Sequence, residues 1–178
     1  MKQLLFILFI LCAGSMTAQK VNWMTMDEAL VAQEKEPKKI IMDVYTVWCG
    51  PCKLLDKKTF GDQTVADFIN KNFYPVKFNA EGPEEINYQD FTYTNPNYQP
   101  ARKGRNATHF FADALKLTGY PSIVFFEDNG TLIQAVPGYK TPQELEIYLK
   151  MIANDDYKDL TTVEAWEAYQ KKFKGTFK

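Results

Sequence analysis

A short apolar strand that leads into a helix opening with two cysteines constrains this chain more than any other feature. Residues 39–45, KIIMDVY, form a β-rich apolar run with the length of a buried central strand. Pro51 stands where the first turn of a helix accepts proline, and residues 53–60 continue that helix. Cys49 and Cys52 therefore face the same side of its opening turn.

Helical and strand patterns alternate along the rest of the chain. We expect helices at residues 27–35, 64–70, 108–117, 142–153 and 162–172, and strands at residues 73–78, 122–127 and 132–136. The Asp-Asn-Gly turn at 128–130 joins the last two strands as a hairpin. This alternation predicts an α/β fold with a central mixed β-sheet flanked by helices.

The composition indicates one domain with its own core. Of 178 residues, 46% are hydrophobic and 15% are aromatic, which is too apolar for a disordered chain and enough for a sizeable core. The 21 basic and 22 acidic side chains give a net charge of −1, so a general nucleic-acid-binding function is excluded. Three cysteines are too few for a disulfide-built scaffold.

The first 18 residues have the pattern of a secretory signal peptide. A lysine at position 2 precedes the apolar run 4–13, small or polar residues follow, and we expect cleavage after Ala18. The apolar run is half of the roughly 20 residues that a membrane-spanning helix needs. We therefore expect a periplasmic or secreted protein that has no stable membrane insertion once the signal is removed.

The predicted cleavage leaves residues 19–178 as a single domain with two cysteines. Cys12 would leave with the signal. We favour this over a lipid anchor on Cys12, because Leu11 is bulkier than the small residue that usually precedes a lipidated cysteine. The remaining pair, Cys49 and Cys52, forms either a local disulfide or a redox switch.

The spacing of the two cysteines predicts dithiol–disulfide exchange. Cysteines at i and i+3 in one helical turn come within the ~4.4–6.8 Å between α-carbons that a disulfide requires. Unpaired N–H groups and the helix dipole favour a thiolate at Cys49, which we expect to have a lowered pKa and to attack substrate. We expect Cys52, one turn deeper, to be shielded and to resolve the mixed disulfide.

Three other interpretations of the pair fit less well. A zinc site needs four ligands, and beyond the pair the mature chain offers only His109 and carboxylates. Covalent haem attachment needs a histidine after the second cysteine, where this chain has Lys53. A purely structural disulfide would close a loop too short to constrain the unfolded chain much. This interpretation nevertheless remains an alternative. We predict no metal and no cofactor, and we interpret His109 as an ordinary residue at a helix start.

The motif WCGPCK after the strand IIMDVY resembles the thioredoxin active-site signature. The resemblance to the thioredoxin family covers most of residues 39–153, interrupted by 81–106. The wider segment KKIIMDVYTVWCGPCKLLDKKTF is similar to exported thioredoxin-like proteins and to the reducing periplasmic domain of the disulfide-reductant transporter family. The resemblance to the thioredoxin family implies the thioredoxin fold and a catalytic Cys49–Cys52 pair.

The same resemblance implies roles for residues behind and opposite the cysteines. Asp43 would be the buried acid with a raised pKa that accepts the proton of Cys52, and Lys77 would approach it from the next strand. Pro121 matches a cis-proline, which would expose the backbone of Tyr120 to pair with an extended substrate.

Residues of the motif itself are expected at the substrate surface. We expect Trp48, Gly50 and Pro51 to contact substrate, with Trp48 as a docking surface rather than a catalytic group. The Gly-Pro dipeptide is that of reducing thioredoxins, so the resemblance suggests that the dithiol is a good reductant.

An insertion before the cis-proline strand and a C-terminal extension depart from the family pattern. The insertion, residues 81–106, carries four aromatic side chains and both arginines of the protein: Tyr88, Phe91, Tyr93, Tyr98, Arg102 and Arg105. It is either a docking flap at the active site or a segment packed on the far side with its own small core. The extension, residues 154–178, contains the last predicted helix.

Three functions remain open from the sequence. We favour an exported thiol–disulfide oxidoreductase that reduces protein disulfides. A membrane thiol electron donor would regenerate it, because no nucleotide-binding signature is present. The alternatives are a disulfide oxidase or isomerase, and a redox-inert module that uses the fold for protein contacts.

Overall fold

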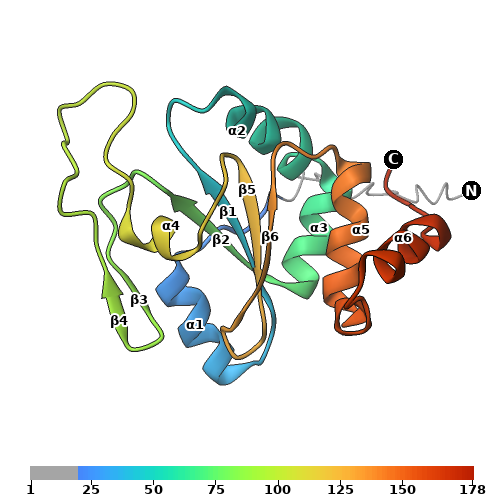
Figure 1. The fold of residues 1–178 in the computed structure, drawn as a ribbon. Coiled ribbons are helices and arrows are strands. Elements are labelled where there is room, and N and C mark those ends of the chain that lie inside the picture. Colours follow the sequence, from blue (N-terminus) through green and yellow to red (C-terminus); the bar gives the residue numbers. More distant parts are fainter. Residues whose placement is uncertain (1–19) are drawn as a thin grey trace, which may run out of the picture.

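A computed structural model describes residues 20–178, and the predicted signal segment 1–18 with Cys12 lies outside the described residues. Among the described residues, no helix is both long and apolar enough to cross a membrane. A four-stranded sheet forms the centre of the molecule, and helices cover both of its faces (Figure 1). The predicted α/β fold with a central mixed sheet is confirmed.

The strand order is β2-β1-β5-β6, which makes the strand before the cysteines a central one. β1 (Ile40–Tyr45) pairs in parallel with β2 (Tyr74–Asn79) and antiparallel with β5 (Ser122–Phe126). β6 (Leu132–Pro137) pairs antiparallel with β5 and forms one edge. Because β1 is hydrogen-bonded on both sides, it holds the following loop and helix in a fixed position.

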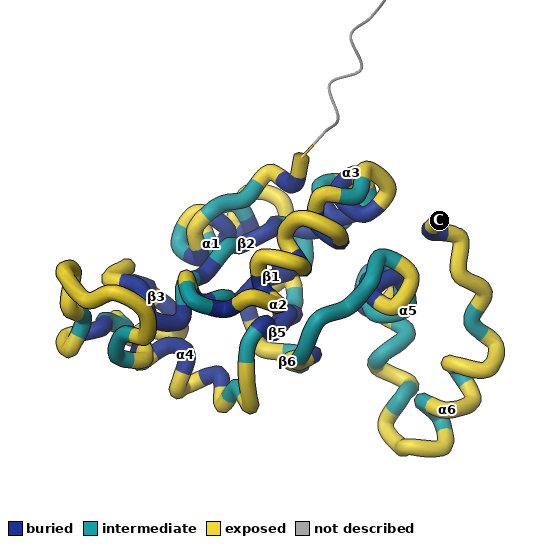
Figure 2. Tube along the Cα trace, turned by 90° about the horizontal axis from the view of Figure 1, so that it is seen from above, coloured by how far each residue is buried: buried dark blue, intermediate teal, exposed yellow. Residues whose placement is uncertain are grey.

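The alternation of side chains along β1 and β5 divides the core into two clusters. Ile41, Ile123 and Phe125 face the helices α3 (Gln63–Asn72) and α5 (Pro142–Ala153). The alternate residues face the other side of the sheet, where α1 (Met26–Lys35) and α4 (Phe110–Ala114) pack. Every residue of these two strands is buried except Tyr45, as Figure 2 shows for the centre of the molecule.

The cysteine-bearing helix begins where predicted but has two parts. α2 (Gly50–Leu55) continues directly as a π-helical turn, η1 (Asp56–Phe60). The helix predicted at 108–117 is shorter than expected, because α4 ends at Ala114 and Lys116 adopts a left-handed conformation with φ 52°. His109 lies at its N-cap, as predicted, where Nδ1 accepts a hydrogen bond from the N–H of Phe111 at 3.0 Å.

The insertion contains a hairpin that the sequence pattern did not predict. β3 (Ile86–Tyr88) and β4 (Phe91–Tyr93) pair antiparallel, and both residues of the turn between them have positive φ, as a two-residue hairpin requires. Tyr88 is buried against Phe111 and Phe126, and its hydroxyl donates a hydrogen bond to the carbonyl of Gly130 at 3.0 Å. The insertion therefore contributes to the core through β3.

A buried carboxylate of α5 anchors the end of the C-terminal extension. Glu146 accepts hydrogen bonds from the N–H groups of Thr176 at 2.6 Å and Phe177 at 3.0 Å, and Lys150 Nζ lies 2.6 Å from it. Burial acts to raise the pKa of Glu146, but these hydrogen bonds outweigh it and hold the pKa below its usual value.

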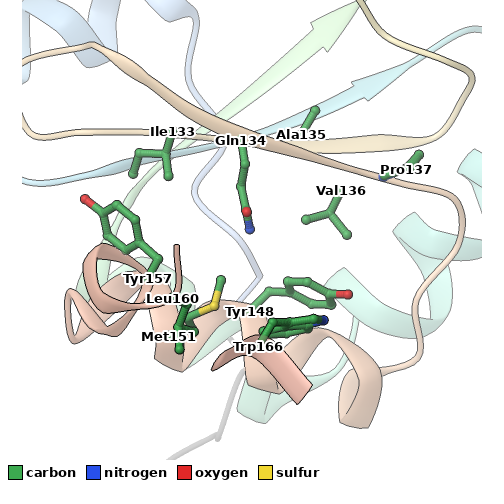
Figure 3. Close-up of a pocket in the computed structure, with 10 residues that line it drawn as sticks. All are labelled: Ile133, Gln134, Ala135, Val136, Pro137, Tyr148, Met151, Tyr157, Leu160 and Trp166. Carbon is green, nitrogen blue, oxygen red and sulfur yellow. The ribbon is translucent and has the colours of Figure 1, made fainter. Parts of the chain in front are cut away.

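The extension also forms one wall of a groove along β6. It contains the 3-10 turn η2 (Asp156–Asp159) and α6 (Val163–Lys172), which is the predicted extra helix. Figure 3 shows Tyr148, Met151 and Trp166 lying below this edge strand, in a groove of about 430 Å³. Neither Cys49 nor Cys52 lines this groove.

Candidate active site

The two cysteines form a disulfide at the N-terminus of α2. Their α-carbons are 5.3 Å apart, within the range predicted from their spacing. Cys49 is the N-cap of the helix, and its sulfur accepts a hydrogen bond from the N–H of Cys52 at 3.1 Å. The N–H of Cys49 in turn donates to the carbonyl of Thr46 at 3.2 Å. The end of β1 and the start of the helix thus hold the pair together.

Both cysteines are shielded from solvent in the disulfide form. Cys52 is 4% exposed, which confirms that it is shielded, and Cys49 is equally buried at 2% exposed. The bond holds both sulfurs within one helical turn, which gives them similar surroundings. What distinguishes Cys49 is its place at the helix N-terminus, where the N–H of Cys52 donates to its sulfur.

Behind the cysteines, Asp43 and Lys77 form an ion pair. They are direct neighbours in the register of β1 and β2, and Lys77 Nζ lies 2.9 Å from Asp43 Oδ2. Among the described residues, Asp43 Oδ1 has no hydrogen-bond partner. Lys77 also lies 2.6 Å from Asp56 on η1. Lys77, Asp56 and Cys52 line one pocket of about 350 Å³, so the lysine of the ion pair shares a pocket with the second cysteine.

The burial of Asp43 changes its acidity. Burial raises the pKa of Asp43 to about 6, and the positive charge of Lys77 opposes part of this rise. Asp56 raises the pKa of Asp43 further, by repulsion between the two carboxylates. Burial lowers the pKa of Lys77, but the two carboxylates outweigh this and raise it above its usual value. Asp43 can therefore exchange a proton near neutral pH.

Trp48 is held by the two ends of the insertion. Its Nε1–H donates a hydrogen bond to Glu81 Oε2 at 2.8 Å, and the same oxygen accepts from the N–H of Asn106 at 2.7 Å. The guanidinium carbon of Arg105 lies 4.3 Å from the centroid of the indole ring. The insertion therefore packs into the core through its hairpin and reaches the active site through its ends.

The remaining predicted site residues lie around the same end of the sheet. The Tyr120–Pro121 peptide bond is cis, as the resemblance implies. It immediately precedes β5, whose first residue pairs with Val44 near the end of β1. Gly50 and Pro51 are exposed in the first turn of α2, and Tyr120 is half-buried.

Three residues at the site were not identified as functional from the sequence, Thr46, Asp56 and Glu81, and Arg105 was named only as part of the insertion that could form a docking flap. Thr46 is buried, and its hydroxyl has no hydrogen-bond partner among the described residues. Asp56 lies one helical turn after Cys52, so its spacing could have placed it on this side of the helix. Glu81 and Arg105 meet Trp48 only through the tertiary fold, and no local signal points to them.

Comparison with known proteins agrees with this geometry. Residues 26–153 match a family described as thioredoxin-like domain. The chain is 25% identical over 121 residues to "Thiol:disulfide interchange protein DsbD" of Pectobacterium atrosepticum, covering 67% of this chain and 17% of that protein. The chain therefore spans less than a fifth of the length of this relative.

Two solved structures share the fold. A thioredoxin-fold protein from Helicobacter pylori has a TM-score of 0.57 and 16% identity, covering 76% of this chain and 81% of that one. A protein from Bacteroides thetaiotaomicron that is proposed to be a disulphide-isomerase has a TM-score of 0.52 and 25% identity. The match covers 76% of this chain and 94% of that one.

The family match and the cysteine pair together define the chemistry. A thioredoxin-like domain with a cysteine pair at a helix N-terminus has the arrangement of a protein-disulfide oxidoreductase. Because the matched residues make up well over half of the sequence, the chain belongs to the family of thioredoxin-like domains.

Proposed function

We propose that this protein is exported and that it reduces disulfide bonds of other proteins through Cys49 and Cys52. The observation that carries the proposal is the Cys49–Cys52 disulfide at a helix N-terminus, with the Asp43–Lys77 ion pair behind it. Export rests on the signal pattern of residues 1–18, and the domain would then comprise residues 19–178. The Gly-Pro dipeptide between the cysteines supports the reducing direction.

The reaction transfers two electrons to the substrate. In the reduced protein, the Cys49 thiolate attacks one sulfur of the substrate disulfide, and the other substrate sulfur leaves as a thiolate that takes a proton from water. Asp43 accepts the proton of Cys52, through the pocket that Cys52 and Lys77 line. The Cys52 thiolate then attacks Cys49, the substrate leaves fully reduced, and the protein holds the Cys49–Cys52 disulfide.

Other residues position the substrate in this proposal. The exposed Gly50 and Pro51, together with Trp48, form the surface beside Cys49, and the backbone of Tyr120 before Pro121 pairs with an extended substrate segment. A membrane thiol electron donor returns the disulfide to the dithiol. The name of the Pectobacterium relative, a thiol:disulfide interchange protein, supports exchange with thiol–disulfide partners.

Reduction of insulin tests the proposal. With a dithiol donor, the wild-type protein should precipitate the insulin B chain, whereas Cys49→Ser should be inactive because the attacking sulfur is missing. Cys52→Ser should accumulate a mixed disulfide with insulin, detected on a non-reducing gel, because resolution is blocked. Inactivity of the intact protein would overturn the proposed reaction. Sequencing the N-terminus of the mature protein tests export, and an intact Met1 would contradict it.

A disulfide isomerase is the second candidate. The Bacteroides protein with 25% identity is proposed to be one, and it shares the fold over 76% of this chain. Reactivation of scrambled ribonuclease separates the two functions. A reductase should reactivate it slowly and only with added glutathione oxidant, whereas an isomerase should reactivate it at a catalytic rate.

A further inference from the structure

We propose that Arg105, held over the indole ring of Trp48, selects disulfide substrates that carry an acidic side chain beside their cysteine. This inference rests on the proposed function, because it names a substrate class for the same cysteine pair. It starts from the insertion, whose ends meet at the active-site tryptophan.

The position of Trp48 is fixed by a buried carboxylate. Glu81 is 7% exposed, and its Oε2 accepts hydrogen bonds from both the indole N–H of Trp48 and the backbone N–H of Asn106. One oxygen atom therefore links the residue before Cys49 to the residue after Arg105. The side chain of Asn106 also joins the two sides of the loop. Its Oδ1 accepts a hydrogen bond from the N–H of Gln99, and its Nδ2 donates one to the carbonyl of Gln99.

This anchoring places a positive charge over the residue that directly precedes the attacking cysteine. The guanidinium carbon of Arg105 is 4.3 Å from the centroid of the indole of Trp48, a distance at which a cation is attracted to an aromatic face. Arg105 is an exposed residue, so its N–H groups are accessible to a substrate. Because Trp48 directly precedes Cys49, a substrate that reaches the sulfur passes close to this charge.

The basic side chains of the loop form no ion pair with the described carboxylates. Arg102 and Lys103 are also exposed, and within residues 20–178 neither of them nor Arg105 forms an ion pair with a carboxylate. The buried Glu81, whose Oε2 accepts two hydrogen bonds, is not within ion-pair distance of Arg105. The whole chain has a net charge of −1, so this basic loop is a local feature rather than part of a basic protein.

The chemistry of a guanidinium defines the partner. Its fork of N–H donors matches a carboxylate, with which it can form two parallel hydrogen bonds. A Glu or Asp beside the substrate cysteine would thus be attracted as the disulfide approaches Cys49, and a Lys or Arg at that place would be repelled. An exposed pair of this kind changes an equilibrium by about 1.5-fold to fivefold.

Three peptides test the inference. They share one intramolecular disulfide and differ only in the residues flanking the attacked cysteine, which are Glu, Gln or Lys. At low salt, kcat/KM of the wild type should be about 1.5-fold to fivefold higher for the Glu peptide than for the Gln peptide, and lowest for the Lys peptide. The preference should shrink in 1 M salt, where the Debye length is about 3 Å.

Matched variants assign the preference to Arg105. Arg105→Gln should bring the three peptides close to one value, and Arg105→Lys should keep their order because it keeps the charge. Lys35→Gln removes one exposed charge at the end of α1, away from the cysteines, and should leave the preference unchanged.

Two results would overturn the inference alone: turnover of all three peptides without preference, or an equal loss on all three in Arg105→Gln. The second would assign Arg105 to the packing of Trp48 or to the reactivity of Cys49, and the alkylation rate of Cys49 by a neutral reagent would change with it. Failure to reduce any of the peptides would overturn the proposed function as well.

Discussion

Asp43 is a carboxyl group that lies almost entirely out of contact with solvent. Its carboxyl is 1% exposed, and burial raises its pKa to about 6 against about 3.9 in an unfolded chain. A raised pKa in the folded state means that protonation stabilises the fold. The stabilisation is complete below about pH 4 and is lost as the pH rises through about 6. At neutral pH the charged Asp43 therefore costs about 3 kcal/mol relative to its protonated form.

Asp43→Asn should separate the stability of the protein from its activity. The variant should raise the free energy of unfolding by about 2–3 kcal/mol at pH 8 and by little at pH 4. Because the acceptor for the proton of Cys52 is lost, decay of the mixed disulfide should slow by about 10²-fold. Urea denaturation of the oxidised protein at both pH values measures the first effect, and quenched-flow kinetics measure the second.

The exposed acid Asp67 on α3 supplies the control for this variant. Asp67→Asn should leave both the stability and the decay rate nearly unchanged, since it keeps its helix and lies at the surface. A gain in stability of Asp43→Asn that is the same at pH 4 and pH 8 would contradict the assignment of the raised pKa.

At the scale of elements, the hairpin of β3 and β4 divides its aromatic side chains between core and surface. Tyr88 is 8% exposed and packs against Phe111 and Phe126, whereas Phe91 is 68% exposed. Asn87 fixes the hairpin to α1, because its N–H donates to Asp27 Oδ1 at 3.0 Å. The hairpin thus stabilises the sheet face that lies opposite α3 and α5.

Two truncations in this hairpin should therefore differ in cost. Tyr88→Ala should lower the free energy of unfolding by about 3–4 kcal/mol, because it opens a cavity in the core. Phe91→Ala should change it by less than about 0.5 kcal/mol, because the side chain lies at the surface. Urea denaturation measures both, and equal costs would show that the hairpin is not packed as described.

The elements that were predicted from the sequence share strong local signals. α5 starts with the Thr141 cap and Pro142, and its ends agree with the prediction. The hairpin was missed because strands of three residues are too short to show an alternating pattern, and Gln89–Asp90 lacks the glycine typical of such a turn. α4 was predicted too long because the left-handed Lys116 carries no sequence signal.

For the whole molecule, the chemistry of the site was more predictable than its surroundings. The cysteine pair follows from spacing, and the neighbours Asp43 and Lys77 follow from the family resemblance and from strand register. The contacts around Trp48 join residues 33 positions apart, such as Trp48 and Glu81, and depend on how the insertion returns to the sheet. No periodicity or motif encodes such a contact, so only the fold reveals it.

Whether the whole protein donates or accepts electrons depends on the reduction potential of the Cys49–Cys52 disulfide. A single measurement tests this direction. The oxidised and reduced protein is equilibrated with glutathione buffers of stepped ratio, the thiols are alkylated, and the two forms are counted by mass spectrometry. A reductase of this kind should have a reduction potential for Cys49–Cys52 near −250 to −270 mV, about that of reducing thioredoxins. A potential of about −180 mV or higher, where disulfide isomerases and oxidases lie, would contradict the proposed reduction of protein disulfides.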